Sequence, residues 1–233
     1  VILSLFDIAD EEKSIKTLKK IATEEYSTDW GVRSNSSKSI MYSPGNLGWY
    51  SYQHGKVWPL ITGWCTVAEF KNHMVKEAMR NLKSFAILTE IDFPGVIPET
   101  VRGDRIEATD CYHQLWSSAM FLFSVIYGIF GMVPNSFDNE LSFTVHLPEE
   151  ISSIALSNLR FVDNSIDISV VRKKGIEVRL SSEKPVKINL SVAFDAREVW
   201  IDGEKVEFTK WYEECQHTNI SLEVKRRCEV RLR

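Results

Sequence analysis

The sequence predicts an α+β protein of more than one domain, in which a helical part is followed by an antiparallel β-sandwich. Apolar residues recur at helical spacing in the first part of the chain, and beyond about Phe137 they alternate with polar residues at a period of two. The length of 233 residues suffices for one large domain or for two modest ones. We therefore predict a helical domain over residues 1–137 and a β-sandwich domain over residues 138–233.

Three helices are expected in the helical domain. Asp10 suits an N-cap position before the first apolar stripe. The second helix is expected roughly over residues 58–82, with Pro59 in its first turn. The third is expected roughly over residues 112–130, with Asp110 suited to its N-cap. The last two are apolar on more than one side, which is typical of helices buried between other helices.

Several short strands are expected in the second domain. The alternation is clearest in three runs, whose apolar members are Ile166, Ile168 and Val170; Ile176, Val178 and Leu180; and Ile188, Leu190 and Val192. The dipeptide Asp202-Gly203 lies between two apolar runs and predicts a β-hairpin. Short strands at this spacing are typical of a β-sandwich.

Charge and cysteine content argue against several classes of function. The formal net charge of -4 gives no electrostatic reason to expect nucleic acid or an anionic membrane as a partner. The longest apolar run, residues 119–133, is too short to span a bilayer comfortably. The cysteines and histidines are scattered without metal-ligand spacing, so we expect no metal, no cofactor and a reducing, cytoplasmic location. Because the chain begins at Val1, we expect its start to be processed, trimmed or cut from something longer.

Two stretches combine flat aromatic rings with hydrogen-bonding groups. Residues Gly48–Trp64 contain three Trp and two Tyr together with a His and a Gln, and residues Pro98–Ser118 add carboxylates. Sugars suit this mixture, because their C–H faces stack on rings while their hydroxyl groups need fixed donors and acceptors. The sequence therefore predicts a carbohydrate-processing site, close to long connections of the kind that often carry function.

Glu99 is the strongest catalytic candidate. Hydrolysis of a glycosidic bond normally needs two carboxyl groups, of which one protonates the leaving oxygen and the other activates water or attacks the sugar. Glu99 follows a proline in a loop and suits the base of such a pair, although its spacing alone also fits an exposed loop glutamate. Asp104, Glu107 and Asp110 are rival candidates that also fit helix caps or surface charges.

The other candidates divide by their expected surroundings. Rings that fall in loops indicate a ligand when they are exposed; these are Trp30, Trp49 and Tyr50. Rings that fall at helical positions pack in the core by default; these are Trp58, Trp64 and Trp116. His54 fits either a contact with a sugar hydroxyl or a structural hydrogen bond.

These residues resemble the C-terminal portion of the (α/α)6-barrel glycosidases, especially the amylo-α-1,6-glucosidase (glycogen-debranching) and glucoamylase-like group. Three pieces carry the likeness, over about residues 30–119. Residues 29–34, Asp-Trp-Gly-Val-Arg-Ser, resemble the family's Gly-x-Arg-Ser/Thr loop. Residues 52–64 resemble its Tyr-His-x-Gly-x-Val-Trp-Pro segment. Pro98-Glu99 and residues 111–119 resemble its Pro-Glu and Cys-x-x-Gln-Ala-Trp-Ser-Ala segments.

The resemblance implies a partial (α/α)6 helical toroid and an inverting α-glucan glucosidase of the debranching type, with Glu99 as the general base. The family's general acid lies earlier in its chain, in a region without a counterpart here. Leu115 replaces a residue that is usually small, which bears on substrate fit. The residues expected to bind an α-glucan or oligosaccharide are Trp30, Arg33, Tyr52, His54, Trp58, Gln114 and Trp116.

Chain length limits this interpretation. Such a barrel has twelve helices, whereas the helical domain here can supply roughly four or five helices of typical length. We therefore expect the end of a larger enzyme, completed by a complementing chain, an N-terminal segment or a homo-oligomer. Two alternatives stay open. One is a noncatalytic carbohydrate-binding or interaction subunit; the other, less favoured because phosphate needs no carboxylate base, is a phosphorylase of similar architecture.

Overall fold

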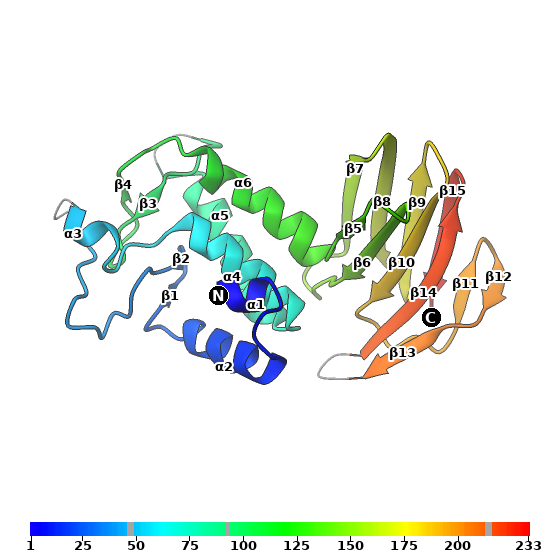
Figure 1. Cartoon of the computed structure of the whole chain (residues 1–233), viewed down its shortest axis with the longest axis horizontal. Helices are drawn as coiled ribbons and strands as arrows, with labels where there is room; N and C mark the ends of the chain where they lie inside the picture. Colours follow the sequence, from blue (N-terminus) through cyan, green and yellow to red (C-terminus); the bar gives the residue numbers. More distant parts are fainter. Residues whose placement is uncertain (46–48, 92–93, 213–215) are drawn as a thin grey trace. The chain divides into compact units, whose positions relative to one another are not determined.

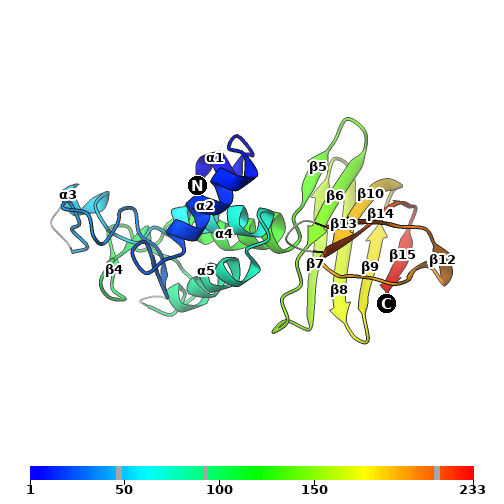
Figure 2. The same cartoon turned by 90° about the horizontal axis from the view of Figure 1, so that it is seen from below.

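The chain forms two units, Val1–Gly128 and Ile129–Arg233, in a computed structural model (Figures 1 and 2). The structure describes residues 1–45, 49–91, 94–212 and 216–233. The side chain of Trp49, which the sequence suggests as an exposed ring, lies outside the described part. The first unit is mainly helical and the second is built from strands, which confirms the α+β class. The domain boundary after residue 137 stays a prediction.

Two helices of the first unit, α2 and α4, begin where the sequence indicates. The α-helices are α1 (Ile2–Leu5), α2 (Glu11–Ile21), α3 (Trp49–Tyr52), α4 (Pro59–Lys71), α5 (Val75–Leu88) and α6 (Leu115–Ser124), and a π-helical segment, η1 (Val125–Ile129), follows α6. Asp10 is the N-cap of α2, as predicted, because its side chain accepts a hydrogen bond from the backbone N–H of Lys13 at 2.9 Å. Pro59 occupies the first turn of α4, where a missing N–H leaves no helical bond unmade.

Two of the predicted helices differ from the observed ones. The predicted helix over residues 58–82 is two helices, because α4 ends before His73, whose left-handed backbone (φ 58°) does not continue a helix. The predicted helix over residues 112–130 begins only after Gln114, which is its N-cap. Asp110 is therefore not the helix cap that the sequence suggested. It has a left-handed backbone (φ 63°), and its side chain forms an ion pair described below.

Helix α4 forms the centre of the first unit. Helices α2, α5 and α6 all contact it, and Figure 1 shows α4, α5 and α6 side by side. Its apolar residues are buried on more than one side, as predicted, and include Val67, Ala68 and Phe70. Helix α6 in contrast keeps exposed apolar side chains, among them Leu115 and Leu122, so its predicted burial is wrong for that face. This arrangement does not confirm the partial toroid that the resemblance implies.

The second unit consists of two sheets that lie face to face (Figures 1 and 2). One sheet has the strand order β13-β14-β10-β6-β5, and the other has the order β12-β11-β15-β9-β8-β7. The strands are β5 (Val133–Asn135), β6 (Glu140–Val145), β7 (Ser153–Phe161), β8 (Asn164–Arg172), β9 (Ile176–Ser182), β10 (Val186–Val192), β11 (Val199–Ile201), β12 (Glu204–Val206), β13 (Thr209–Tyr212), β14 (Gln216–Val224) and β15 (Arg227–Leu232). The apolar members of the predicted runs in β8, β9 and β10 are buried, which confirms the period of two.

The sandwich is mixed rather than purely antiparallel. Strands β6 and β10 pair in parallel, with Leu141 opposite Ile188. The reason is topological, because β7, β8 and β9 belong to the other sheet and β10 then returns to lie beside β6 in the same direction. The predicted Asp202-Gly203 hairpin is confirmed by the antiparallel pairing of β11 with β12. Both turn residues have positive φ (49° and 91°), as the favoured two-residue hairpin turn requires.

Candidate active site

Two short hairpins and one loop bring together the three segments that resemble the (α/α)6-barrel glycosidases. The hairpins are β1 (Ser27–Thr28) with β2 (Gly31–Val32), and β3 (Thr100–Val101) with β4 (Ala108–Thr109). Val57 lies between them, because it forms antiparallel bridges with Arg33 on one side and Val101 on the other. In Figure 1, α3, β3 and β4 lie together at one end of the first unit. The two hairpins, joined through Val57, therefore bring together segments that are far apart in the sequence. We call this arrangement the backbone frame.

Two glycines allow this frame to close. A Cβ atom at Gly103 would lie 1.9 Å from the carbonyl oxygen of Gly55, which no side chain can tolerate. Gly55 also has a φ of 130°, which only glycine adopts at little cost. The glycine of the second family-like segment is thus explained by backbone geometry and close approach.

Glu99 directly precedes β3 and is half-buried. Its backbone N–H donates to the carbonyl of Cys111 at 2.7 Å, and its Oε1 accepts a hydrogen bond from the hydroxyl of Tyr52, also at 2.7 Å. Burial and then the hydrogen bond to Glu99 raise the pKa of Tyr52 to about 12. The phenol is therefore protonated at neutral pH and donates to the carboxylate, which fixes one carboxylate oxygen of Glu99.

Trp58 packs against Tyr52 and holds it in place. The two rings pack edge to face with centroids 4.6 Å apart, and the indole N–H of Trp58 donates to the carbonyl of Tyr52 at 3.0 Å. Trp58 is only 6% exposed. Its contribution to sugar binding would therefore pass through Tyr52 rather than through its own ring.

An ion pair between a buried lysine and a partly exposed aspartate lies beside this group. Lys56 has a fully buried side chain, and its Nζ lies 2.6 Å from Oδ2 of Asp110. The hydroxyl of Thr100 donates to the same Oδ2. Burial acts to raise the pKa of Asp110, but the hydrogen bonds from Lys56 and Thr100 outweigh it and hold that pKa below its usual range. Sequence reasoning missed Lys56, although a lysine inside an otherwise aromatic and apolar stretch was a signal of a buried charge.

The other rival carboxylates belong to surface ion pairs. Asp104 accepts two hydrogen bonds from the guanidinium of Arg102, each at 2.9 Å. Glu107 accepts a hydrogen bond from Arg105 at 2.6 Å. Both carboxylates are exposed and paired with arginine, whereas the oxygen of Glu99 is bound by a neutral phenol. Glu99 is therefore the better placed of the three for proton transfer.

The polar groups of Trp30 and Arg33 donate hydrogen bonds to backbone carbonyls of the same chain. The indole N–H of Trp30 donates to the carbonyl of Arg102 at 2.8 Å. Arg33 donates to the carbonyls of Gly103 and Glu24, at 2.8 and 2.7 Å. Both side chains are half-buried, so part of each still faces outward. These contacts tie the first family-like segment to the loop between β3 and β4.

The remaining predicted site residues are His54, Gln114 and Trp116. His54 stacks on Tyr50 with ring centroids 4.7 Å apart, and its Nδ1 lies 2.6 Å from the Tyr50 carbonyl oxygen. The backbone N–H of Gln114 donates to the carbonyl of Ile97 at 3.1 Å, which keeps the start of α6 beside the Glu99 loop. Trp116 on α6 is 43% exposed and offers an open ring. The structure thus links Trp58 to Tyr52 and Tyr52 to Glu99 by direct contact, whereas Trp116 lies on helix α6.

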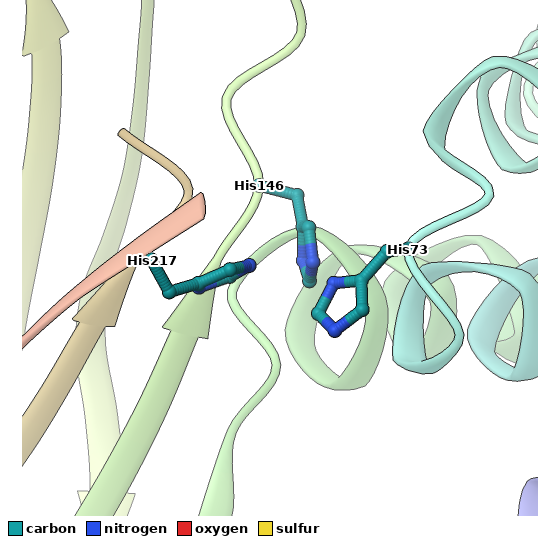
Figure 3. Close-up of side chains that lie close together, drawn as sticks. All are labelled: His73, His146 and His217. Atoms are coloured by element: carbon teal, nitrogen blue, oxygen red, sulfur yellow. The ribbon is translucent and has the colours of Figure 1, made fainter. Parts of the chain in front are cut away.

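Two histidines of the second unit also come together. His146 and His217 are buried, and their rings meet edge to face with centroids 5.4 Å apart (Figure 3). The Nδ1 of His217 lies 2.9 Å from the Ser191 hydroxyl. These two histidines are therefore not scattered as the sequence suggested. Two imidazoles by themselves do not provide the four ligands of a structural zinc site, and the expectation of no metal stays a prediction.

One family model matches part of the chain. Residues 136–191 match the model described as Glycosyl hydrolase family 65, C-terminal domain. The match covers strands β6 to β9 and all of β10 except its last residue. It supports a general glycoside-hydrolase role, and it does not bear on the amylo-α-1,6-glucosidase and glucoamylase-like group or on inversion. No curated protein matches the chain.

Solved structures give weak similarities only. A protein assigned as a kojibiose phosphorylase from the human microbiome has 16% identity and a TM-score of 0.41, over 72% of this chain and 19% of that chain. A GH127 β-L-arabinofuranosidase from Geobacillus stearothermophilus has 16% identity and a TM-score of 0.36, over 74% of this chain and 30% of that chain. A second GH127 β-arabinofuranosidase has 11% identity and a TM-score of 0.42, over 94% of this chain and 39% of that chain. The chain thus spans less than half the length of each protein, and scores this low carry no conclusion about function.

Membrane insertion has no support from the described helices. None of the helices in the part of the chain that the structure describes has both the length and the apolar character that a membrane-spanning segment needs.

Proposed function

We propose that this chain is the end part of an inverting α-glucan glucosidase of the debranching type and that Glu99 is its general base. The carrying observation is the hydrogen bond from Tyr52 to Oε1 of Glu99, at 2.7 Å. A general base must be ionised and aimed, and a protonated phenol at this distance favours both. The motif resemblance supports the substrate class, and the family model supports the general glycosidase role.

The proposed reaction follows from this arrangement. The second oxygen of Glu99 takes a proton from a water molecule while the water oxygen attacks the anomeric carbon. The glycosidic C–O bond breaks at the same time, and the leaving oxygen receives a proton from a general acid. That acid belongs to the part that completes the enzyme. Attack from the face opposite the leaving group inverts the configuration of the released sugar.

Substrate contacts would come from the loops around Glu99. Exposed and half-buried rings stack on sugar faces, and polar tips bind hydroxyl groups. The proposed set is Trp30, Arg33, Tyr52, His54, Trp58, Gln114 and Trp116. Within this set, Trp116 offers the most exposed ring and Trp58 acts by holding Tyr52. A cytoplasmic location would suit the storage glucans on which such an enzyme acts.

Exposed apolar side chains support the need for a completing part. On α6, Leu115 is 82% exposed and Leu122 is 59% exposed. Near α1, Phe6 is 64% exposed and Ile8 is 69% exposed. Extensive exposed apolar surface normally marks a contact with another chain or segment. We propose that an N-terminal segment, a complementing chain or a further copy covers these faces.

The test is glucose release from branched and linear maltooligosaccharides. The chain is assayed alone and together with the segment encoded just before it, with Glu99→Gln in both settings. Activity only in the mixture and its loss in Glu99→Gln would support the proposal. Full activity of the isolated chain would contradict the division of the site between two parts. Cleavage only in the presence of phosphate would favour a phosphorylase instead.

A second candidate is a noncatalytic carbohydrate-binding or interaction subunit. One observation favours it, because the N–H groups of Trp30 and Trp58 and the guanidinium of Arg33 already bind backbone carbonyls. In this interpretation the main role of these side chains is to hold the backbone in place, and any contact with a sugar is secondary. If the chain is such a subunit, we expect it to bind oligosaccharides equally well with and without Glu99→Gln. We also expect no turnover in any mixture.

A further inference from the structure

The outer face of one sheet in the second unit carries a patch of uncharged polar side chains. In the sheet β13-β14-β10-β6-β5 (Figure 1), most inner residues of β6, β10 and β14 are buried and the residues between them face outward. Strand register sets six outward residues in two adjacent rows, with Ser142 beside Asn189 and Ser221, and Thr144 beside Ser191 and Asn219. We call these six residues the polar grid. All are half-buried except Ser221, which is exposed.

A pocket of about 440 Å³ lies over the polar grid. All six grid residues line it, together with Glu207, Phe208 and Thr209. Thr209 pairs with Asn219, so the second row continues onto β13. Ligand pockets commonly measure roughly 300–1,000 Å³. The pocket over the polar grid therefore has a volume suited to a small ligand.

The lack of charge is a local property of the polar grid. The outer face of the other sheet also has a pocket, of about 550 Å³, but its lining includes the charged residues Asp167, Arg179, Asp202, Arg227 and Glu229. On the grid's own sheet, charges return one row further along the strands, where Lys187 lies between Glu140 and Glu223. The fold itself thus accepts charged side chains on both outer faces, and the grid differs from its surroundings.

The chemistry of the polar grid selects a neutral ligand. Hydroxyl and amide groups both donate and accept hydrogen bonds. Two contacts orient them, because Ser221 donates to Oδ1 of Asn189 at 2.7 Å and the hydroxyl of Ser191 lies 2.9 Å from Nδ1 of His217. An anion would call for lysine or arginine in the lining, and a hard cation would call for more oxygen ligands with charge than the single carboxylate of Glu207. A polyhydroxylated neutral molecule matches the groups that are present.

An exposed indole lies on the same face. Trp211 of β13 pairs with His217, two residues along from the pairing of Thr209 with Asn219, so it stands one row beyond the polar grid. Its side chain is 41% exposed, and its ring lies 5.9 Å from the ring of the buried His217. A sugar stacks its C–H face on a ring of this kind while its hydroxyl groups reach polar side chains. Trp211 and the polar grid together offer both kinds of contact.

We propose that the polar grid and Trp211 form a binding site for a neutral oligosaccharide, made by the second unit alone. The site makes and breaks no bond. It holds sugar hydroxyl groups on the grid and a sugar ring on the indole. It does not depend on the proposed role of Glu99.

The test is ¹H–¹⁵N NMR of the ¹⁵N-labelled full chain, titrated separately with maltoheptaose and with cellopentaose. The resonances followed are the side-chain amides of Asn189 and Asn219 and the indole N–H of Trp211, assigned with Asn189→Ala, Asn219→Ala and Trp211→Ala. We expect these resonances to shift together and to saturate with at least one of the two sugars. Trp211→Ala should weaken that binding about tenfold or more, because it removes the stacking ring.

Ser169→Ala is the matched control, because Ser169 faces outward on β8 in the other sheet, and this variant should bind like wild type. Saturable shifts at the polar grid that Trp211→Ala weakens and Ser169→Ala does not would support the proposal. It would be overturned if neither sugar moved the grid resonances, if trigalacturonate with its carboxylates moved them equally, or if Trp211→Ala bound like wild type. Should a variant fail to fold, the wild-type titrations with the neutral and charged sugars decide the matter. The readout needs no turnover, so a failed hydrolysis assay leaves this inference standing, and unmoved grid resonances leave the role of Glu99 standing.

Discussion

Glu69 on α4 gives a sharp prediction about stability and pH. Its side chain is fully buried, and Asn81 donates to its Oε2 at 2.8 Å, while its Oε1 has no hydrogen-bond partner among the described residues. Burial raises the pKa of Glu69 from 4.5 to about 8, against the opposing effects of Asn81 and Arg80. The folded protein therefore favours the protonated acid. We expect Glu69→Gln, which resembles that neutral form, to remove a pH dependence of folding.

The sign and size follow from this shift. Because the pKa of Glu69 is raised in the folded state, its contribution to stability is fully present below about pH 4.5 and is lost as the pH rises to about 8. At about 1.4 kcal/mol per unit, the loss over this range is about 5 kcal/mol at most. This is a large share of the stability of an ordinary domain, roughly 5–15 kcal/mol.

The assay is urea unfolding of wild type and Glu69→Gln, followed by tryptophan fluorescence at several pH values from 5 to 8. The variant should gain on wild type steadily as the pH rises. Glu90→Gln is the matched control, because Glu90 is exposed at the end of α5, and its difference from wild type should stay small at every pH. A constant difference between Glu69→Gln and wild type across the range would refute the reasoning.

Two further substitutions probe the candidate site. Gly103→Ala should destabilise the chain by about 2–4 kcal/mol in urea unfolding, because the added Cβ would lie 1.9 Å from the Gly55 carbonyl oxygen. Gly45→Ala, whose Cβ would meet only a flexible arginine side chain at 3.3 Å, is its control, and equal losses in both would contradict the prediction. Tyr52→Phe should lower kcat of the completed enzyme about 10- to 100-fold, because it removes a hydrogen bond to a charged group worth about 1.5–3 kcal/mol. Tyr127→Phe, in the middle of the π-helical segment and 36% exposed, should leave kcat unchanged, and an unaffected Tyr52→Phe would count against the role of the phenol.

Local chemistry explains which elements the sequence predicted. The Asp10 cap and the Asp202-Gly203 hairpin depend on a few neighbouring residues, so their signals are readable in one short stretch. The break at His73 has no such signal, because neither glycine nor proline marks it. The parallel pairing of β6 with β10 depends on the path of the chain through the other sheet, which a local pattern does not contain.

The same distinction holds for the site. Glu99 was predicted from its motif and from the chemistry that a glycosidase needs. Its contact with Tyr52 and the pairing of Lys56 with Asp110 join residues far apart in the chain, so spacing could not reveal them. Asp110 is the example of a wrong local prediction. Its position fits a helix cap, but its carboxylate forms an ion pair with the buried Lys56.

The central claim is that Glu99 activates water in an inverting hydrolysis. The most direct measurement is the anomeric form of the glucose first released from an α-linked maltooligosaccharide, followed by ¹H NMR in the completed enzyme before mutarotation. The account predicts β-glucose from wild type and no release from Glu99→Gln. First release of α-glucose, a sugar phosphate as the product, or undiminished release from Glu99→Gln would contradict it.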